Sequence, residues 1–249
     1  MQLAILLYDR VTALDAIGPY EVLQAPGLGI DVRFVAREKG MKRTDFGRLG
    51  LMADYALDEV PRPDILLIPG TAYPQAVMGD PVVLEWIAQV HKTTKWTTSV
   101  CTGALGLAAA GVLQGLKATT HWLALDVLKQ FGAIPTKERV VRQGKVVTAA
   151  GVSSGIDMAL TLVAEEFGAA AAQTAQLLIE YDPQPPFDSG SPDKAPPLVV
   201  SAAREEFRKL SQQSGGDPDS RPHTRADVRG ESVPAKRGVG CRVTRTITC

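Results

Sequence analysis

Cysteine and histidine are scarce in this chain of 249 residues, which contains three of each. An odd number of cysteines, two of them near the end of the chain, is not a disulfide framework, so a reducing cytoplasm is the expected location. The histidines are scattered and no C-x-x-C pair is present, so the sequence offers no ligand set for a metal. It also lacks G-x-x-x-x-G-K-[ST] and a G-x-G-x-x-G after a strand, so no nucleotide-phosphate site is predicted.

The chain also lacks net charge, with 27 Lys and Arg against 27 Asp and Glu. Balanced charge argues against a nucleic-acid partner, although basic groups are in excess from Arg204 onward. No apolar run reaches the length of a membrane span, and no basic segment precedes an apolar core at the amino terminus. The sequence therefore predicts neither a membrane helix nor a signal peptide, and its length suits one α/β domain or two small ones.

What the chain does contain is an alternation of buried strands and helices. Apolar runs at 4–8 and 65–68 are typical of strands covered on both faces in a parallel sheet. Asp80 predicts a helix N-cap, and Ser154 with Asp157 predicts a capping box. The alternation favours an α/β fold, a mostly parallel sheet sandwiched by helices, in which ligands bind beyond the carboxyl ends of the strands. Further elements are expected as strands at 30–35, 139–141 and 145–148, short strands within 50–57, and helices at 18–23, 122–130 and 170–181.

The stretch 97–107 predicts a strand, a sharp turn that carries Cys101, and then a helix. This geometry resembles a nucleophile elbow, which projects its side chain at the top of a sheet with a helix amino terminus behind it. The helix N–H groups and macrodipole would lower the pKa of the thiol and could hold a developing negative charge. The alternative is that Cys101 is a small buried core residue.

Asp15 and the Gly70-Thr71 pair follow other strands and are expected at the same sheet edge as Cys101. Burial beneath a thiolate would raise the pKa of Asp15, so that it could act as a general acid. The alternative is an ordinary loop aspartate that caps a helix starting near Gly18.

Backbone N–H groups near Cys101 could form an oxyanion hole. The N–H of Thr102 is one candidate donor, and the Thr102 hydroxyl could reach substrate or water. Alternatively, Thr102 only helps to cap the helix that follows. The N–H groups of Gly70 and Thr71 are the second candidates, although a Pro-Gly turn needs no function. His121 could pair with Cys101, or it could be a packed structural histidine.

Beyond Phe207 the chain has no aromatic residue and only scattered aliphatic ones. Such a segment cannot bury enough surface to offset its chain entropy, so disorder is expected there. A functional basic tail is the alternative.

Several motifs occur in order along the chain and resemble the DJ-1/PfpI family, which has the class I glutamine amidotransferase-like, flavodoxin-like fold. Two further segments resemble the bacterial isonitrile hydratases within that family. The first group is LDAIGPYEVL at 14–23, IPG at 68–70, SVCTGA at 99–104 and ATTHW at 118–122; the second is GVSSGID at 151–157 and EYDPQPPFDSGSP at 180–192.

The resemblance implies hydration of an isonitrile to an N-substituted formamide through a cysteine thioimidate, with no metal or organic cofactor. Cys101 would be the nucleophile, Asp15 the acid and Thr102 a required partner. The resemblance also implies a homodimer and covers a family domain at 1–205. The composition, and not the resemblance, predicts a basic, disordered tail at 206–249.

The chain departs from the family pattern at a few positions. Thr71 stands where such relatives commonly have a second glycine, and Ala149-Ala150 replaces a glycine run. Thr102 stands where the protease-like members have histidine, which disfavours peptidase activity. Two alternatives remain. One is a glyoxalase-like or deglycase-like enzyme, although those relatives usually have glutamate in place of Asp15. The other is a ligand-sensing domain of an AraC-type regulator, for which 208–249 is too short and too poor in apolar periodicity.

Overall fold

A sheet of seven strands forms the centre of the structure, a computed structural model that describes residues 1–212. Its strands are β1 (Gln2–Leu6), β2 (Asp31–Ala36), β5 (Tyr55–Ala56), β6 (Ile65–Ile68), β7 (Trp96–Val100), β10 (Val140–Gln143) and β11 (Val146–Ala149). They are ordered β10-β11-β7-β6-β1-β2-β5. All neighbours pair in parallel except β10 and β11, which form an antiparallel hairpin that turns at Gly144. The mostly parallel α/β sheet is therefore confirmed.

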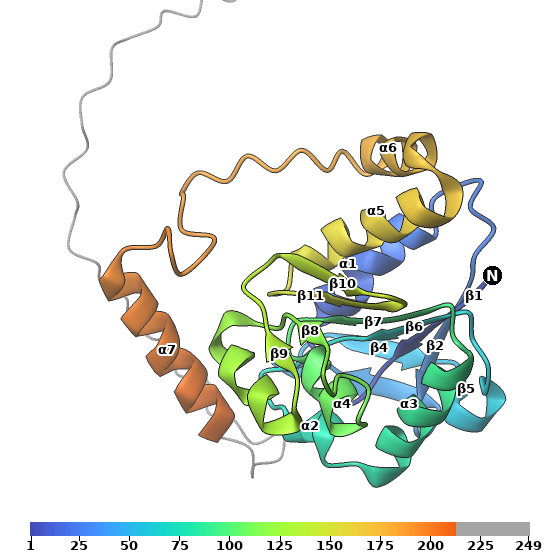
Figure 1. The fold of residues 1–249 in the computed structure, drawn as a ribbon, viewed down its shortest axis with the longest axis horizontal. Helices are drawn as coiled ribbons and strands as arrows, with labels where there is room; N and C mark the ends of the chain where they lie inside the picture. Colours follow the sequence, from blue (N-terminus) through green and yellow to red (C-terminus); the bar gives the residue numbers. More distant parts are fainter. Residues whose placement is uncertain (213–249) are drawn as a thin grey trace, which may run out of the picture. The chain divides into compact units, whose positions relative to one another are not determined.

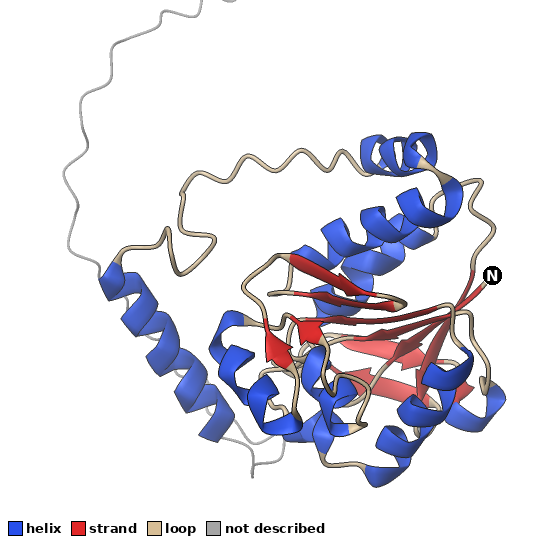
Figure 2. Cartoon of the chain, in the orientation of Figure 1, coloured by secondary structure: helices blue, strands red, loops and turns tan. Residues whose placement is uncertain are grey.

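Helices cover both faces of the sheet, as Figures 1 and 2 show. In Figure 1, α1 (Ala13–Leu23) and α5 (Ser154–Phe167) lie above the sheet, and α6 (Ala169–Leu178) packs on α5. Below the sheet lie α2 (Gln75–Met78), α3 (Pro81–Thr93) and α4 (Gly103–Ala109). The remaining elements are the hairpin β3 (Gly40–Arg43) and β4 (Gly50–Ala53), the pair β8 (Lys117–Ala118) and β9 (Ile134–Pro135), the 3₁₀ helices η1 (Leu57–Glu59) and η2 (Trp122–Phe131), and α7 (Pro197–Gln212).

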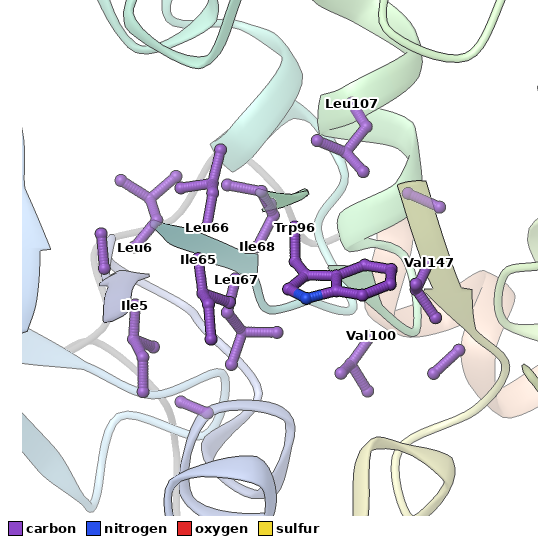
Figure 3. Close-up of a cluster of buried hydrophobic side chains, with 14 of the residues drawn as sticks. Ile5, Leu6, Ile65, Leu66, Leu67, Ile68, Trp96, Val100, Leu107 and Val147 are labelled. Atoms are coloured by element: carbon purple, nitrogen blue, oxygen red, sulfur yellow. The ribbon is translucent and has the colours of Figure 1, made fainter. Parts of the chain in front are cut away.

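The core is built on β6, which supplies four consecutive buried side chains. Figure 3 shows them among apolar side chains from the neighbouring strands and from α4. Because successive strand residues point to opposite faces, an unbroken apolar run is the pattern of a strand with helices on both sides. The sheet thereby fixes the carboxyl ends of β1, β6 and β7 at a common edge. In the described part of the chain, no helix is long and apolar enough to cross a membrane.

The predicted start of a helix near Gly18 is wrong. Helix α1 begins at Ala13, with Thr12 as N-cap, so Asp15 lies in its first turn and Pro19 in its interior. Proline is favoured at the first helical position, which is why Gly18-Pro19 resembles a helix start.

The predicted N-cap at Asp80 is confirmed, because the Asp80 side chain accepts N–H hydrogen bonds from the first turn of α3.

The capping box expected at Ser154 and Asp157 is also not formed. The Asp157 carboxylate instead binds Arg139, at 2.7 Å from its Nε, and the hydroxyl of Tyr181 at 3.1 Å. The Ser154 hydroxyl donates to the carbonyl of Gly151 at 2.8 Å.

Helix α7 continues to Gln212, past the predicted domain boundary at 205 and past Phe207. Its half-buried apolar residues include Val200, Phe207 and Leu210, which share one helical face. The rest of the predicted tail, with Cys241 and Cys249, lies outside the described residues.

Two leucine substitutions test the contribution of β6 to stability. Leu67→Ala should lower the free energy of unfolding by about 2–5 kcal/mol, because Leu67 is fully buried and leaves a cavity. Leu177→Ala, at a side chain that is 77% exposed, should change it by no more than about 0.5 kcal/mol. Urea denaturation of both variants checks this, and equal losses would contradict the assignment of the core.

Candidate active site

The predicted sharp turn is present, and Cys101 occupies it with φ of 55°. This left-handed conformation costs a non-glycine residue about 1–3 kcal/mol, so the surroundings must hold it. The Cys101 N–H donates to the carbonyl of Ala150 at 2.8 Å, and its carbonyl accepts from the Thr120 hydroxyl at 2.8 Å. Gly103 follows at a place where a Cβ atom would lie 2.0 Å from the Ile68 carbonyl oxygen. A tight strand-to-helix elbow therefore presents the thiol.

Asp15 reaches the same place from the first turn of α1 and is fully buried. The N–H of Gly70 donates to its Oδ2 at 2.8 Å, while Oδ1 has no hydrogen-bond partner among the described residues. Burial raises the pKa of Asp15 to about 8, opposed by the hydrogen bond from Gly70. The charge of Asp45 raises this pKa further, and interaction with Cys101 lowers it. Asp15 is therefore protonated at neutral pH, and the expected upward direction of its pKa is confirmed.

The pKa of the Cys101 thiol is raised, whereas the sequence predicts that it is lowered. Its side chain is 5% exposed, and burial raises its pKa well above the ordinary value, with a further increase from the charge of Asp15. The N–H groups of Thr102 and Val152 act on the sulfur in the opposite direction without cancelling the effect of burial. The prediction of a lowered thiol pKa is wrong because desolvation outweighs the nearby N–H groups. The resting site thus holds a neutral thiol beside a neutral acid.

The N–H groups of Gly70 and Thr71 are already engaged within the protein. Gly70 donates to Asp15, and the Thr71 N–H donates to the Thr102 hydroxyl at 2.7 Å. That hydroxyl in turn donates to the Thr71 carbonyl at 2.6 Å. Gly70, Thr71 and Thr102 lie together, as the sequence predicts. However, the N–H groups of Gly70 and Thr71 and the hydroxyl of Thr102 bind protein groups and hold Asp15 and the elbow in place. They are therefore not free to act as oxyanion donors or to contact a substrate.

Gly70 is required at this turn for a steric reason. A Cβ atom there would lie 2.5 Å from the Thr102 nitrogen, 2.7 Å from its Oγ1 and 2.8 Å from Asp15 Oδ2. Real Cβ atoms do not approach backbone atoms so closely. The acid and the elbow can therefore both bind this turn only where it has no side chain.

Thr71, one of the departures from the family pattern, uses its hydroxyl to join two loops. Its Oγ1 donates to the carbonyl of Arg10 at 2.6 Å and accepts from the Tyr73 N–H at 2.9 Å. Arg10 has φ of 72°, another left-handed backbone that its surroundings must hold. The β-branched side chain is thus accommodated as a link between the loops after β1 and β6.

Sequence reasoning missed three groups that act on Asp15, Cys101 or their surroundings. Tyr8 donates its hydroxyl to the Pro69 carbonyl at 2.6 Å, and burial with the charges of Asp15, Cys101 and Asp45 raises its pKa. Tyr8 follows β1, so the strand-end rule could have found it. Asp45 comes from the β3–β4 loop, which carries no quoted motif. Val152 lies within the GVSSGID segment but acts through its backbone N–H, which no side-chain pattern marks.

His121 lies near the elbow without being among the groups that shift the pKa of Cys101. Burial lowers the pKa of its imidazole, and the ring stacks on Phe207 of α7 with centroids 5.6 Å apart. Its Nδ1 accepts from the Leu123 N–H at 3.4 Å. These contacts favour the packed structural histidine over the Cys–His pair.

A cavity of about 440 Å³ lies beside the carboxyl end of β1. Tyr8, Arg10, Arg37 and Lys42 are among its lining residues, whereas Cys101 is not. The Cys101 thiol therefore belongs to the elbow and not to this cavity.

The raised pKa of Asp15 predicts a specific pH dependence of stability. A carboxyl whose pKa is about 8 when folded and 3.8 when exposed binds more protons in the native state between those values. The free energy of unfolding should therefore fall as pH rises from about 4 to 8, by up to about 1.4 kcal/mol per pH unit from this group.

Asp15→Asn should flatten that dependence, and Asp126→Asn, at an exposed carboxylate, should leave it unchanged. Urea denaturation between about pH 5 and pH 8 measures both. Parallel curves for the wild type and Asp15→Asn would contradict the raised pKa.

Comparison with known proteins is consistent with this geometry. Residues 1–165 match the DJ-1/PfpI family. The chain is 44% identical over 205 residues to the isonitrile hydratase of Pseudomonas putida, covering 82% of this chain and 89% of that protein. It is also 28% identical over 124 residues to an HTH-type transcriptional regulator of Pseudomonas aeruginosa, covering 48% of this chain and 36% of the regulator.

A crystal structure of a ThiJ/PfpI family protein from Pseudomonas syringae matches with a TM-score of 0.80 at 37% identity, covering 86% of this chain and 90% of that one. The turn that carries Cys101, and the nearby Asp15, therefore belong to a fold that is known from other proteins of the family. The chain belongs to the DJ-1/PfpI family.

Proposed function

We propose that the protein hydrates an isonitrile to an N-substituted formamide, with Cys101 as nucleophile and Asp15 as proton donor. The observation that carries the proposal is the buried, protonated carboxyl of Asp15 next to the thiol at the elbow. Similarity to the P. putida isonitrile hydratase supports the choice of substrate class. An isonitrile carbon must gain both a nucleophile and a proton, and the two groups offer one of each.

In the first step the sulfur attacks the terminal carbon of R–N≡C while Asp15 transfers its proton to the same carbon. A C–S bond forms, and the thiol proton passes to the Asp15 carboxylate, giving the thioimidate R–N=CH–S–Cys101. Because its pKa is about 8, Asp15 is protonated when the substrate arrives and basic enough to accept the thiol proton afterwards. A carboxyl with an ordinary pKa would be ionised at neutral pH and could not donate.

In the second step water adds to the thioimidate carbon. Asp15, which now carries the former thiol proton, donates it to the nitrogen and takes a proton from the attacking water, giving R–NH–CH(OH)–S–Cys101. The C–S bond then breaks, the carbon becomes the formamide carbonyl, and the hydroxyl proton returns to the sulfur. The N–H groups of Thr102 and Val152, which act on the sulfur, stabilise its negative charge as it leaves.

Thr102 serves this reaction from behind the reacting atoms. Its hydroxyl is bound to the Thr71 backbone on both its donor and its acceptor side, so it fixes the elbow to the turn that also binds Asp15. Gly70 and Thr71 contribute by holding the acid and the elbow at one place. Neither the acid nor the thiol needs a metal or an organic cofactor for these steps.

Turnover of cyclohexyl isocyanide tests the proposal. The purified protein should form the N-cyclohexylformamide, and Cys101→Ala should abolish this while its circular dichroism stays that of the wild type. Cys241→Ala, a matched substitution outside the described residues, should keep wild-type turnover. Undiminished turnover in Cys101→Ala would contradict the mechanism.

A methylglyoxal assay run beside it tests the glyoxalase-like alternative. Turnover of methylglyoxal by the wild type, with none of the isonitrile, would replace the proposed reaction.

The proposal includes a homodimer, as the resemblance to the family implies, and a cytoplasmic location, as the cysteine content indicates. Light scattering of the purified chain should give about twice the mass of the 26.6 kDa protomer. A mass equal to that of the protomer across micromolar concentrations would exclude the dimer.

A further inference from the structure

A second carboxylate, Asp45, is held against the start of the helix that carries the acid. Asp45 lies in the loop between β3 and β4, and its Oδ2 accepts from the Thr12 hydroxyl at 2.9 Å. Its N–H donates to the carbonyl of Val11 at 3.1 Å. Thr12 is the N-cap of α1, so Asp45 contacts the turn in which Asp15 is buried.

Contacts between the loop after β1 and the β3–β4 hairpin also hold Asp45 in place. Val11 and Thr44 form a parallel backbone bridge. The Arg10 N–H donates to the Arg43 carbonyl, and the Arg43 N–H donates to Asp9 Oδ1 at 2.9 Å. The loop after β1 and the β3–β4 hairpin are thus joined at several points. The hairpin therefore fixes Asp45 with respect to α1.

We propose that Asp45 is a positioning residue for the reaction, whose negative charge at the amino end of α1 keeps the Asp15 carboxyl in the protonated form that donates to substrate. The inference rests on the proposed function, in which Asp15 acts as the acid. It adds a residue from a different element, one that touches neither the thiol nor the reacting atoms in the proposed steps.

Among the described residues, two ionisable groups act on Asp15, Cys101 from the elbow and Asp45 from the β3–β4 loop. Tyr8, at the end of β1, in turn responds to the charge of Asp15. Burial is the main reason that Asp15 stays protonated, and the charge of Asp45 acts in the same direction. Tyr8 responds to Asp45 in the same sense, which places the field of Asp45 across the site. A second negative charge near a buried carboxyl disfavours its ionised form.

Infrared titration of the buried acid tests the proposal without any isonitrile. The C=O band of protonated Asp15, identified by its loss in Asp15→Asn, should have a pH midpoint that is about one unit lower in Asp45→Asn. Asparagine keeps an oxygen that can accept from Thr12, so the hairpin contact is retained. Asp126→Asn removes a distant exposed carboxylate and should leave the midpoint at its wild-type value.

Thr12→Val separates charge from packing, because it removes the hydrogen bond and keeps the Asp45 carboxylate. Its midpoint should remain above that of Asp45→Asn. An unchanged midpoint in Asp45→Asn, or an equal fall in Thr12→Val, would overturn the proposal.

Turnover gives an independent reading. Since the protonated acid is the active form, the alkaline limb of the kcat profile for cyclohexyl isocyanide should move to lower pH in Asp45→Asn by the same interval as the infrared midpoint. A shifted midpoint in a protein that turns over no isonitrile would reject the proposed function and keep the electrostatic role of Asp45. A shifted midpoint with an unmoved kcat limb would overturn the role of Asp45 in the reaction.

Discussion

One turn of backbone holds the site together. The N–H of Gly70 binds Asp15, and the N–H and carbonyl of Thr71 bind the hydroxyl of Thr102. The Gly70 carbonyl also accepts from the Thr12 N–H at 2.8 Å, at the start of α1. Since β6 lies between β1 and β7 in the sheet, the turn after it can reach the elements that follow both. The relative position of Asp15 and Cys101 is therefore set by the strand order and by a glycine that leaves room for both.

The electrostatics of the site follow from the burial of Asp15 and Cys101. Burial raises the pKa of Asp15 and of Cys101, so both groups are neutral at rest and no buried ion needs a partner. Charge arises in the proposed reaction only when a proton leaves the acid and sulfur attacks. The burial that disfavours the Cys101 thiolate also keeps the Asp15 carboxyl protonated. In the proposed reaction this suits a substrate that must be protonated on carbon.

Much of the fold is predictable from the sequence because its signals are local. The run at Ile65–Ile68 predicts a strand buried on both faces, and the elbow at Cys101 follows from a strand, a turn and a small-residue helix start. Strand-end reasoning brings Asp15 and Gly70 to one edge. The extent of α1 is not predictable from Pro19, because a proline signal for a helix start is outweighed by packing of the whole helix. The sign of the thiol pKa shift and the role of Asp45 depend on three-dimensional burial and on a contact between distant segments, which no local pattern encodes.

The seclusion of Cys101 has a consequence for its redox chemistry. Oxidation by peroxide to a sulfenic acid requires thiolate character and access, whereas Cys101 is only 5% exposed and the pKa of its thiol is raised. The elbow cysteine is thus shielded from the oxidants that modify low-pKa, accessible sensor thiols, and peroxide at moderate concentration should leave its sulfur reduced.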